Sequence, residues 1–137
     1  MPRYALIIGI AHYNKFRNLS KAVTDAGAIA TLLRDYGGYI VRPLPGQLNK
    51  AENRWDSTPE KKLSAKRLGE TLREFLLEQA KDSEALIYFA GHGFEATGST
   101  GEPEGFLAAS DARNDGQNAI RFDDLNKLIS RSSENNS

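Results

Sequence analysis

The order of apolar and polar positions in the first third of the chain predicts a strand, a helix and a second strand. Residues 3–10 (Arg-Tyr-Ala-Leu-Ile-Ile-Gly-Ile) are almost continuously apolar, which is typical of a strand buried on both faces of a parallel sheet. Helical spacing of apolar residues begins near Leu19 and stops at Gly37-Gly38, where glycine favours the end of a helix. The short strand Tyr39–Leu44 follows, so the pattern predicts a right-handed βαβ unit.

The middle of the chain is predicted to contain one long loop, one helix and one further buried strand. The polar stretch Gly46–Glu60 favours a surface loop, in which Trp55 is interpreted as a packing anchor in preference to a ligand platform. A helix is expected over Glu60–Lys81, because large apolar residues recur on one face and charged residues on the other. Ala85–Ala90 is apolar throughout and predicts a third strand.

The remaining segments predict a domain that lacks one element. Phe94–Glu104 favours a flexible loop, Gly105–Ala109 a short extended segment and Arg121–Ser130 a helix. Arg131–Ser137 has no apolar residue and is predicted to be a disordered tail. The strands and helices predict an α/β fold with a mostly parallel sheet. Such a sheet would need another strand after the last helix, so we expect residues 1–137 to be one domain, incomplete at its C-terminus.

Charge and cysteine content exclude several classes of function. The 137 residues hold 18 Lys and Arg against 18 Asp and Glu, so no net basic field favours nucleic acid or an anionic membrane. The longest apolar run near the start is too short to span a bilayer and lacks the marks of a signal peptide, so a cytoplasmic protein without a membrane partner is expected. With no cysteine and only His12 and His92 as imidazoles, disulfides, thiolate metal sites and a histidine-rich metal site are excluded.

His92 is the sharpest chemical signal in the sequence. It follows the predicted strand Ala85–Ala90 directly, and the carboxyl ends of strands are where open α/β sheets place their chemistry. Gly91 and Gly93 flank it without side-chain bulk, which permits close approach of a substrate and leaves the Gly93 amide as an oxyanion donor. An imidazole in this position suits a general base. The alternative is a structural histidine that caps the end of the strand.

Four motifs in one order carry a resemblance to a known family. They are Tyr-Ala-Leu-Ile-Ile-Gly-Ile-Ala-His-Tyr at 4–13, Leu-Ser-Lys-Ala-Val-Thr-Asp-Ala at 19–26, Leu-Ile-Tyr-Phe-Ala-Gly-His-Gly at 86–93 and Gly-Phe-Leu-Ala-Ala-Ser-Asp at 105–111. Over roughly residues 3 to 130 the chain resembles the large-subunit portion of the caspase-like cysteine peptidases, particularly metacaspases and bacterial orthocaspases. The resemblance implies a three-layer caspase-like α/β sandwich and a Cys–His dyad that hydrolyses peptide bonds.

The resemblance also implies roles for three residues. His92 matches the general base, and the amide of Gly93 is placed to help the oxyanion hole. Asp25 matches an acidic residue that lines the pocket for the substrate side chain before the scissile bond, where a carboxylate selects Arg or Lys. Animal caspases carry an arginine just ahead of this helix, whereas this chain has residues 18–20 as Asn-Leu-Ser, so a basic preference is expected. The alternative for Asp25 is a solvated helix carboxylate.

Asp123 and Asp124 resemble the paired aspartates that some metacaspases use among their calcium ligands. Hard oxygen ligands suit calcium, and Glu102 or Glu104 could complete such a site. The alternative is that the two carboxylates in the first turn of a helix complement its dipole without a metal. No cofactor is required for the predicted chemistry, so calcium would act only as an activator.

The sequence departs from the family at the nucleophile. Caspases place the catalytic histidine about 50 residues before the cysteine, which from His92 predicts a thiol near position ~142. We therefore expect the histidine-bearing portion of a cysteine endopeptidase, inactive alone, with a peptide or protein substrate and a C-terminal segment carrying the cysteine as its partners. The missing strand would leave an exposed sheet edge, open to a partner segment, to dimerisation or to aggregation.

Two other classes of function stay open at this point. One is a non-catalytic caspase-like binding or regulatory module that uses the substrate cleft without turnover. The other is an unrelated doubly wound domain that binds a small ligand. The second has less support, because neither G-x-G-x-x-G nor a G-K-[ST] element occurs in the sequence.

Overall fold

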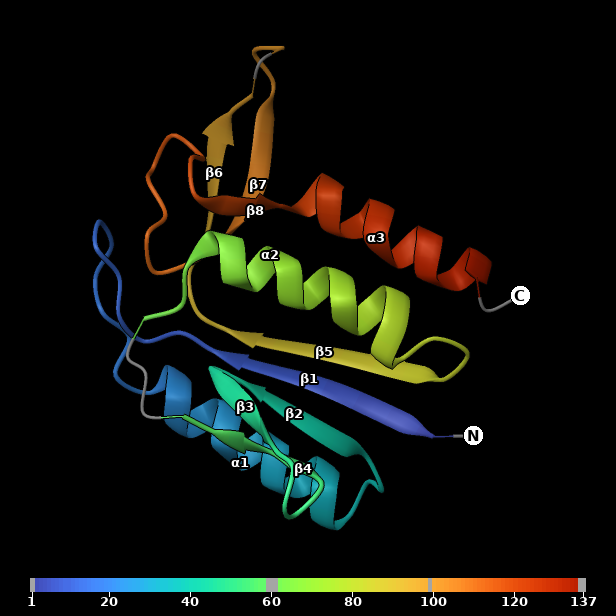
Figure 1. The fold of residues 1–137 in the computed structure, drawn as a ribbon. Coiled ribbons are helices and arrows are strands. Elements are labelled where there is room, and N and C mark those ends of the chain that lie inside the picture. The colour runs from blue at the N-terminus through green and yellow to red at the C-terminus, as the bar shows by residue number, and fades with distance from the viewer. Residues whose placement is uncertain (1, 59–61, 99, 136–137) are drawn as a thin grey trace.

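A computed structural model describes residues 2–58, 62–98 and 100–135. The elements follow one another along the chain as shown in Figure 1. They are β1 (Arg3–Gly9), α1 (Ala22–Asp35), β2 (Ile40–Leu44), β3 (Gly46–Asn49), β4 (Arg54–Ser57), α2 (Ala65–Glu74) with a π-helical continuation (Phe75–Gln79), β5 (Glu84–Ala90), β6 (Gly93–Thr97), β7 (Pro103–Ala108), β8 (Ala119–Arg121) and α3 (Phe122–Asn135).

A parallel sheet in the order β2-β1-β5 forms the middle layer and confirms the predicted α/β class. In Figure 1, α1 covers one face of this sheet, while α2 and α3 lie on the other side. The central strand β1 is buried on both faces because its side chains alternate: Ala5 and Ile7 pack with α1, and Leu6 and Ile8 pack with α2. The predicted βαβ unit is therefore β1-α1-β2.

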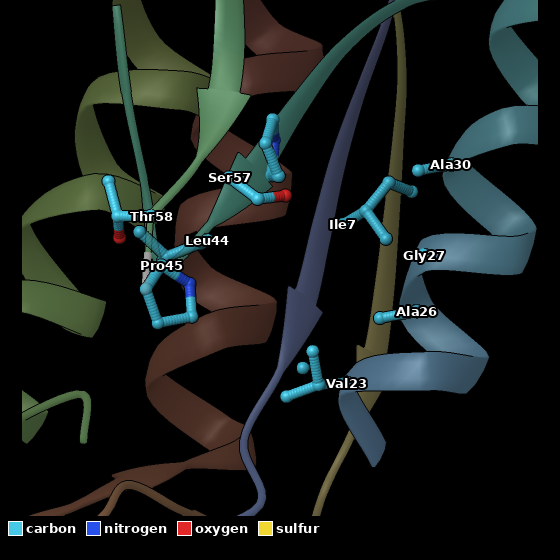
Figure 2. A pocket seen from close by; sticks show the side chains of 11 residues that line it. Ile7, Val23, Ala26, Gly27, Ala30, Leu44, Pro45, Ser57 and Thr58 are labelled. Carbon is cyan, nitrogen blue, oxygen red and sulfur yellow. The ribbon is translucent and has the colours of Figure 1, made fainter. Parts of the chain in front are cut away.

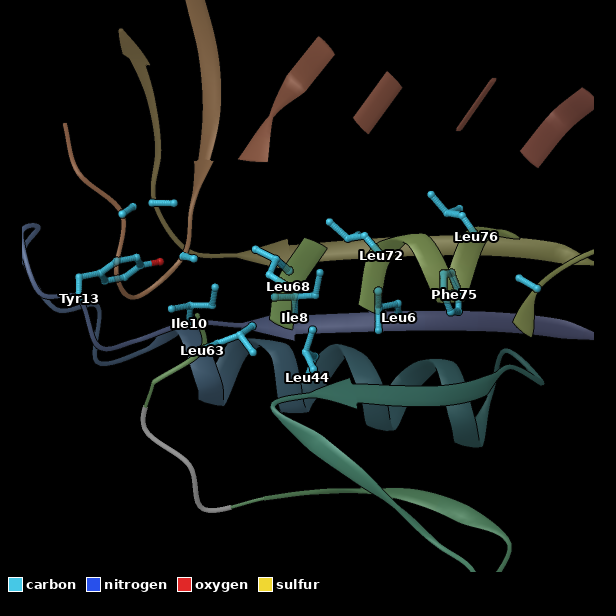
Figure 3. Close-up of a cluster of buried hydrophobic side chains, with 14 residues drawn as sticks. Leu6, Ile8, Ile10, Tyr13, Leu44, Leu63, Leu68, Leu72, Phe75 and Leu76 are labelled. Carbon is cyan, nitrogen blue, oxygen red and sulfur yellow. The ribbon is translucent and has the colours of Figure 1, made fainter. Parts of the chain in front are cut away.

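The larger core cluster lies between β1 and α2 (Figure 3). Leu68, Leu72 and Phe75 approach β1 from one helix face, and each is at most 1 % exposed. The spacing of these three residues is that of one helix face continued into the π-helical turn. The predicted helix over Glu60–Lys81 is thus confirmed from Ala65 to Gln79, whereas residues 62–64 precede the helix and Glu60 lies outside the described residues.

Two segments predicted as loops form β-hairpins instead. Within Gly46–Glu60, β3 and β4 pair antiparallel. Phe94–Glu104 contains most of β6 and the start of β7, which pair antiparallel, and the rest of β7 confirms the extended segment predicted over Gly105–Ala109. Trp55 on β4 is a packing anchor, as predicted: the guanidinium carbon of Arg42 lies 3.9 Å from its ring centroid. The loop prediction was wrong for these strands because each is only four to six residues long. So short a strand shows few changes between apolar and polar positions, and the polar and glycine residues around it favour a loop.

The predicted tail at Arg131–Ser137 is wrong for residues 131–135, because α3 continues to Asn135. The physical reason is a tertiary contact: Ser132 is 7 % exposed, and its hydroxyl donates a 3.0 Å hydrogen bond to the carbonyl of Leu76. Residues 136–137 lie outside the described part of the chain. Across the described ranges, none of the helices combines the length and apolar character needed to cross a bilayer.

Replacing Leu68 by alanine should lower the free energy of unfolding by about 2–5 kcal/mol, because the side chain is fully buried and its loss leaves a cavity. Leu32 on α1 is 54 % exposed, so Leu32→Ala is the matched control and should change stability by less than about 0.5 kcal/mol. Urea denaturation of both variants measures the difference. Equal losses would contradict the assigned α2–β1 core.

Candidate active site

His92 lies at the junction between the parallel sheet and the smaller antiparallel sheet β6-β7-β8. Strand β5 ends at Ala90, and β6 begins at Gly93. Because β1 and β5 are parallel and their last residues pair as Gly9↔Ala90, both strands end at the same edge. The Ile10 amide continues this pairing with a 2.9 Å hydrogen bond to the carbonyl of Ala90. The loop that follows β1 is therefore brought beside His92.

The imidazole of His92 is held by that loop. Its Nε2 atom lies 2.7 Å from the backbone carbonyl oxygen of Arg17. A carbonyl oxygen only accepts hydrogen bonds, so this contact assigns the proton of the neutral ring to Nε2 and leaves Nδ1 as the proton acceptor. The rings of Tyr13 and Phe16 flank the imidazole at centroid distances of 4.7 and 5.6 Å. The half-buried ring is thus oriented on several sides and can accept a proton at Nδ1.

Tyr13 holds the backbone of His92 as well as its ring. The His92 N–H donates a 2.9 Å hydrogen bond to the Tyr13 hydroxyl oxygen. Burial raises the pKa of Tyr13 above the usual tyrosine value, and the hydrogen bond from His92 opposes this shift. A Cβ atom on Gly91 would lie 2.5 Å from the Tyr13 hydroxyl, so glycine is required here for the tyrosine to approach.

The sequence interpretation missed Tyr13 and the carbonyl of Arg17. The need for a small residue at Gly91 was the available signal for Tyr13, because it indicates that something approaches the backbone closely. No signal could have indicated the carbonyl of Arg17, since every residue carries one.

The Gly93 amide lies on an open strand edge. The His92 carbonyl accepts a 2.9 Å bond from the Ala108 amide, so His92 and Ala108 are a hydrogen-bonded pair of the β6–β7 ladder. Hydrogen-bonded and non-hydrogen-bonded pairs alternate along antiparallel strands, and Gly93↔Leu107 is the next pair. The Gly93 N–H therefore points away from β7. Glycine is exposed here, and an added Cβ would meet its nearest atom only at 3.6 Å.

Asp25 lies in a cleft of about 550 Å³ that the carboxyl end of β5 shares with the start of α1. The cleft reaches Gly91, the neighbour of His92, so the structure brings the predicted pocket residue and the predicted base to one region. Asp25 is exposed, and its carboxylate is accompanied by two cationic residues, since Arg17 and Lys21 also line the cleft. The charge balance of this pocket is therefore mixed.

A smaller cavity of about 70 Å³ lies between α1, β1 and the β2–β4 region (Figure 2). Its lining is mostly apolar, including Ile7, Ala26 and Pro45, and none of the described residues that line it is titratable. The cleft that reaches Gly91 differs from this cavity, because the ionisable side chains of Asp25, Arg17 and Lys21 line it.

Asp123 and Asp124 do not join this site. Both stand in the first turn of α3 and face cations: Arg121 lies 3.6 Å from Asp124, and Lys127 lies 3.3 Å from Asp123. Glu104 is held by Arg121 at 2.7 Å. Within the described ranges, no group of three or more His, Asp or Glu side chains is arranged to hold a metal. The two carboxylates therefore pair with cations in the first turn of α3, and the calcium hypothesis stays a prediction.

The fold and the site define an α/β domain with an oriented histidine at the carboxyl end of a parallel strand, beside a cleft. The model of the caspase-domain family, peptidase family C14, matches residues 2–132, and the chain belongs to this family. Its function is therefore protease-related, with protein as the substrate class. No individual curated protein gives a significant match to the sequence.

We expect Gly91→Ala to displace Tyr13 and to lower the free energy of unfolding by about 1–3 kcal/mol, because the added methyl group overlaps the tyrosine hydroxyl. Gly93→Ala is the matched control: it meets no close atom and should change stability by less than about 0.5 kcal/mol. Neither glycine has a positive φ, so the two substitutions differ in packing alone. Urea denaturation and the amide chemical shift of His92 report the effect, and equal behaviour of the two variants would refute it.

Proposed function

We propose that this chain is the histidine-bearing part of a caspase-like cysteine endopeptidase that cleaves after Arg or Lys and is inactive alone. The observation that carries the proposal is the hydrogen bond between His92 Nε2 and the Arg17 carbonyl, because it leaves Nδ1 as the base. The sequence contains no cysteine, so the thiol would come from polypeptide outside these 137 residues.

In the proposed reaction, Nδ1 of His92 takes the proton of the thiol, and the thiolate attacks the scissile carbonyl carbon. The carbonyl oxygen becomes an oxyanion, to which the outward N–H of Gly93 donates. When the C–N bond breaks, the imidazolium returns its proton to the leaving amine, and an acyl-enzyme remains. Water, deprotonated by the same imidazole, then releases the acid and restores the thiol.

The proposed preference for a basic side chain rests on Asp25 in the cleft beside Gly91. A carboxylate in a partly enclosed pocket attracts a guanidinium or ammonium group by charge and hydrogen bonding. Arg17 and Lys21 line the same cleft and oppose this attraction. The preference therefore depends on the carboxylate of Asp25 standing nearest to the substrate side chain.

The second candidate function is a non-catalytic module that binds extended peptides in the same cleft. The absence of cysteine from the 137 residues is the observation that favours it. The two candidates make different claims about the coding sequence beyond Ser137.

The first test reads the coding sequence beyond residue 137 for a strand that ends in an Asp-x-Cys-type motif. The chain extended by such a strand should hydrolyse peptide substrates that carry Arg or Lys directly before the scissile bond. His92→Ala should lower kcat for these substrates by about 10²–10⁴-fold through loss of the base. His12→Ala, the other imidazole, is the control and should leave kcat unchanged. Hydrolysis is measured with a chelator and with added calcium, which also tests the calcium hypothesis at Asp123 and Asp124.

Undiminished hydrolysis by His92→Ala would overturn the assignment of the base. A stop codon with no such strand encoded downstream would favour the non-catalytic module.

Asp25→Asn should lower kcat/KM of the extended chain for Arg substrates by about tenfold or more, because one charge-assisted contact is lost. Asp35→Asn, at the other end of α1, removes the same charge far from the cleft and serves as the control. Competing substrates with Arg, Lys or Asp before the scissile bond measure the preference. An unchanged preference in Asp25→Asn, or a wild-type preference for Asp, would refute the proposed pocket.

A further inference from the structure

We propose that the outer edge of β6 binds the part of the substrate that follows the scissile bond, as an added parallel strand. The edge consists of the outward N–H and C=O groups of Gly93, Glu95 and Thr97. This inference rests on the proposed peptidase function and adds a binding site for the leaving-group side of the peptide.

The register of the β6–β7 hairpin determines which backbone groups are outward. His92 and Ala108 form a hydrogen-bonded pair at one end, and the Gly98 amide bonds the Glu102 carbonyl at 2.8 Å at the other end. Even-numbered residues of β6 therefore bond to β7 along the whole strand. The N–H and C=O of the odd-numbered residues point to the opposite side, where β6 is the edge of its sheet.

This edge is accessible, and its strand is packed against its neighbours. Gly93, Glu95 and Thr97 are exposed, and for a glycine exposure means that the backbone itself is reachable. The side chain of Phe94 anchors the strand by stacking on Phe106, with ring centroids 5.3 Å apart, and by contacting Phe16 at 5.1 Å. A preformed edge binds an extended peptide through main-chain hydrogen bonds with little ordering cost on the protein side.

The position of the cleft determines which part of the substrate reaches β6. The side chain before the scissile bond enters the cleft, which β5 and α1 line, whereas β6 leaves His92 in the direction away from α1 (Figure 1). The residues after the scissile bond therefore continue along β6 toward Thr97. At ~3.3 Å per residue, the strand can pair with about four of them.

The Gly93 oxyanion contact sets the register of this added strand. In a parallel pair, a residue donates its N–H to one carbonyl of the neighbouring strand and accepts from the amide two residues further on. If the Gly93 N–H bonds the scissile carbonyl, the Gly93 carbonyl accepts from the second residue after the scissile bond. The Glu95 N–H then donates to the carbonyl of that same second residue. The amide of the first residue points away from β6.

The test uses the chain as it is, which lacks a thiol and leaves peptides intact. Two peptides are titrated into ¹⁵N-labelled protein: one ends at an arginine amide, and the other continues for four residues beyond the arginine. The longer peptide should bind at least about tenfold more tightly and should slow hydrogen exchange of the Glu95 and Thr97 amides. N-methylation of its second residue beyond the arginine should abolish the gain, whereas N-methylation of the first residue should preserve it.

A protein variant provides an independent check. Glu95→Pro removes an outward N–H and leaves the hydrogen bonds to β7 in place. This variant should therefore bind the longer peptide no more tightly than the shorter one, whereas Glu95→Ala should keep the higher affinity for the longer peptide. Retained protection of the Phe94 and Ala96 amides verifies that β6 still pairs with β7.

Equal affinity of the two peptides, or equal effects of the two N-methyl groups, would overturn the edge site. Binding of the shorter peptide with shifts at Asp25 would then leave the proposed pocket standing. Failure of both peptides to bind would overturn the edge site and the pocket together, whereas the role of His92 is judged separately by hydrolysis in the extended chain.

Discussion

Burial of β1 on both faces is the constraint from which the rest of the molecule follows. Ala5 and Ile7 require a helix on one face, and Leu6 and Ile8 require another on the opposite face. The strand must also have a neighbour on each edge, because its backbone groups are out of reach of water. Since β5 runs parallel to β1, the segments that follow both strands emerge at one edge of the sheet. The site beside His92 is a consequence of this pairing.

A continuous set of aromatic contacts joins the two sheets at that edge. Tyr13 and Phe16 come from the loop after β1, and Phe16 contacts both His92 and Phe94 on the far side of the junction. Phe16, one of the two rings that orient the imidazole, therefore also packs against β6. The proposed base and the proposed peptide-binding edge are thereby parts of one packed unit.

The elements with mostly apolar sequences were predictable, and the short strands rich in polar residues and glycine were not. Ala85–Ala90 is continuously apolar, so β5 and the position of His92 at its end could be predicted. Phe94 and Ala96 alternate with Glu95 and Thr97, but four residues beside several glycines do not distinguish a strand from a loop. The cleft beside Gly91 was predictable only in part. The resemblance indicated Asp25 as a lining residue, whereas the fold alone shows that Arg17 and Lys21 line the cleft as well.

The sequence by itself determined the class of fold, the glycine-flanked histidine and the absence of a thiol, because these depend on residue types and on patterns that neighbouring residues carry. Only the tertiary structure decided which backbone groups serve the site. The carbonyl that holds His92 Nε2 lies 75 residues away along the chain, and the open edge of β6 depends on the register of its pairing with β7. Backbone groups are the same in every residue, so their direction is a property of the fold and leaves no mark in the sequence.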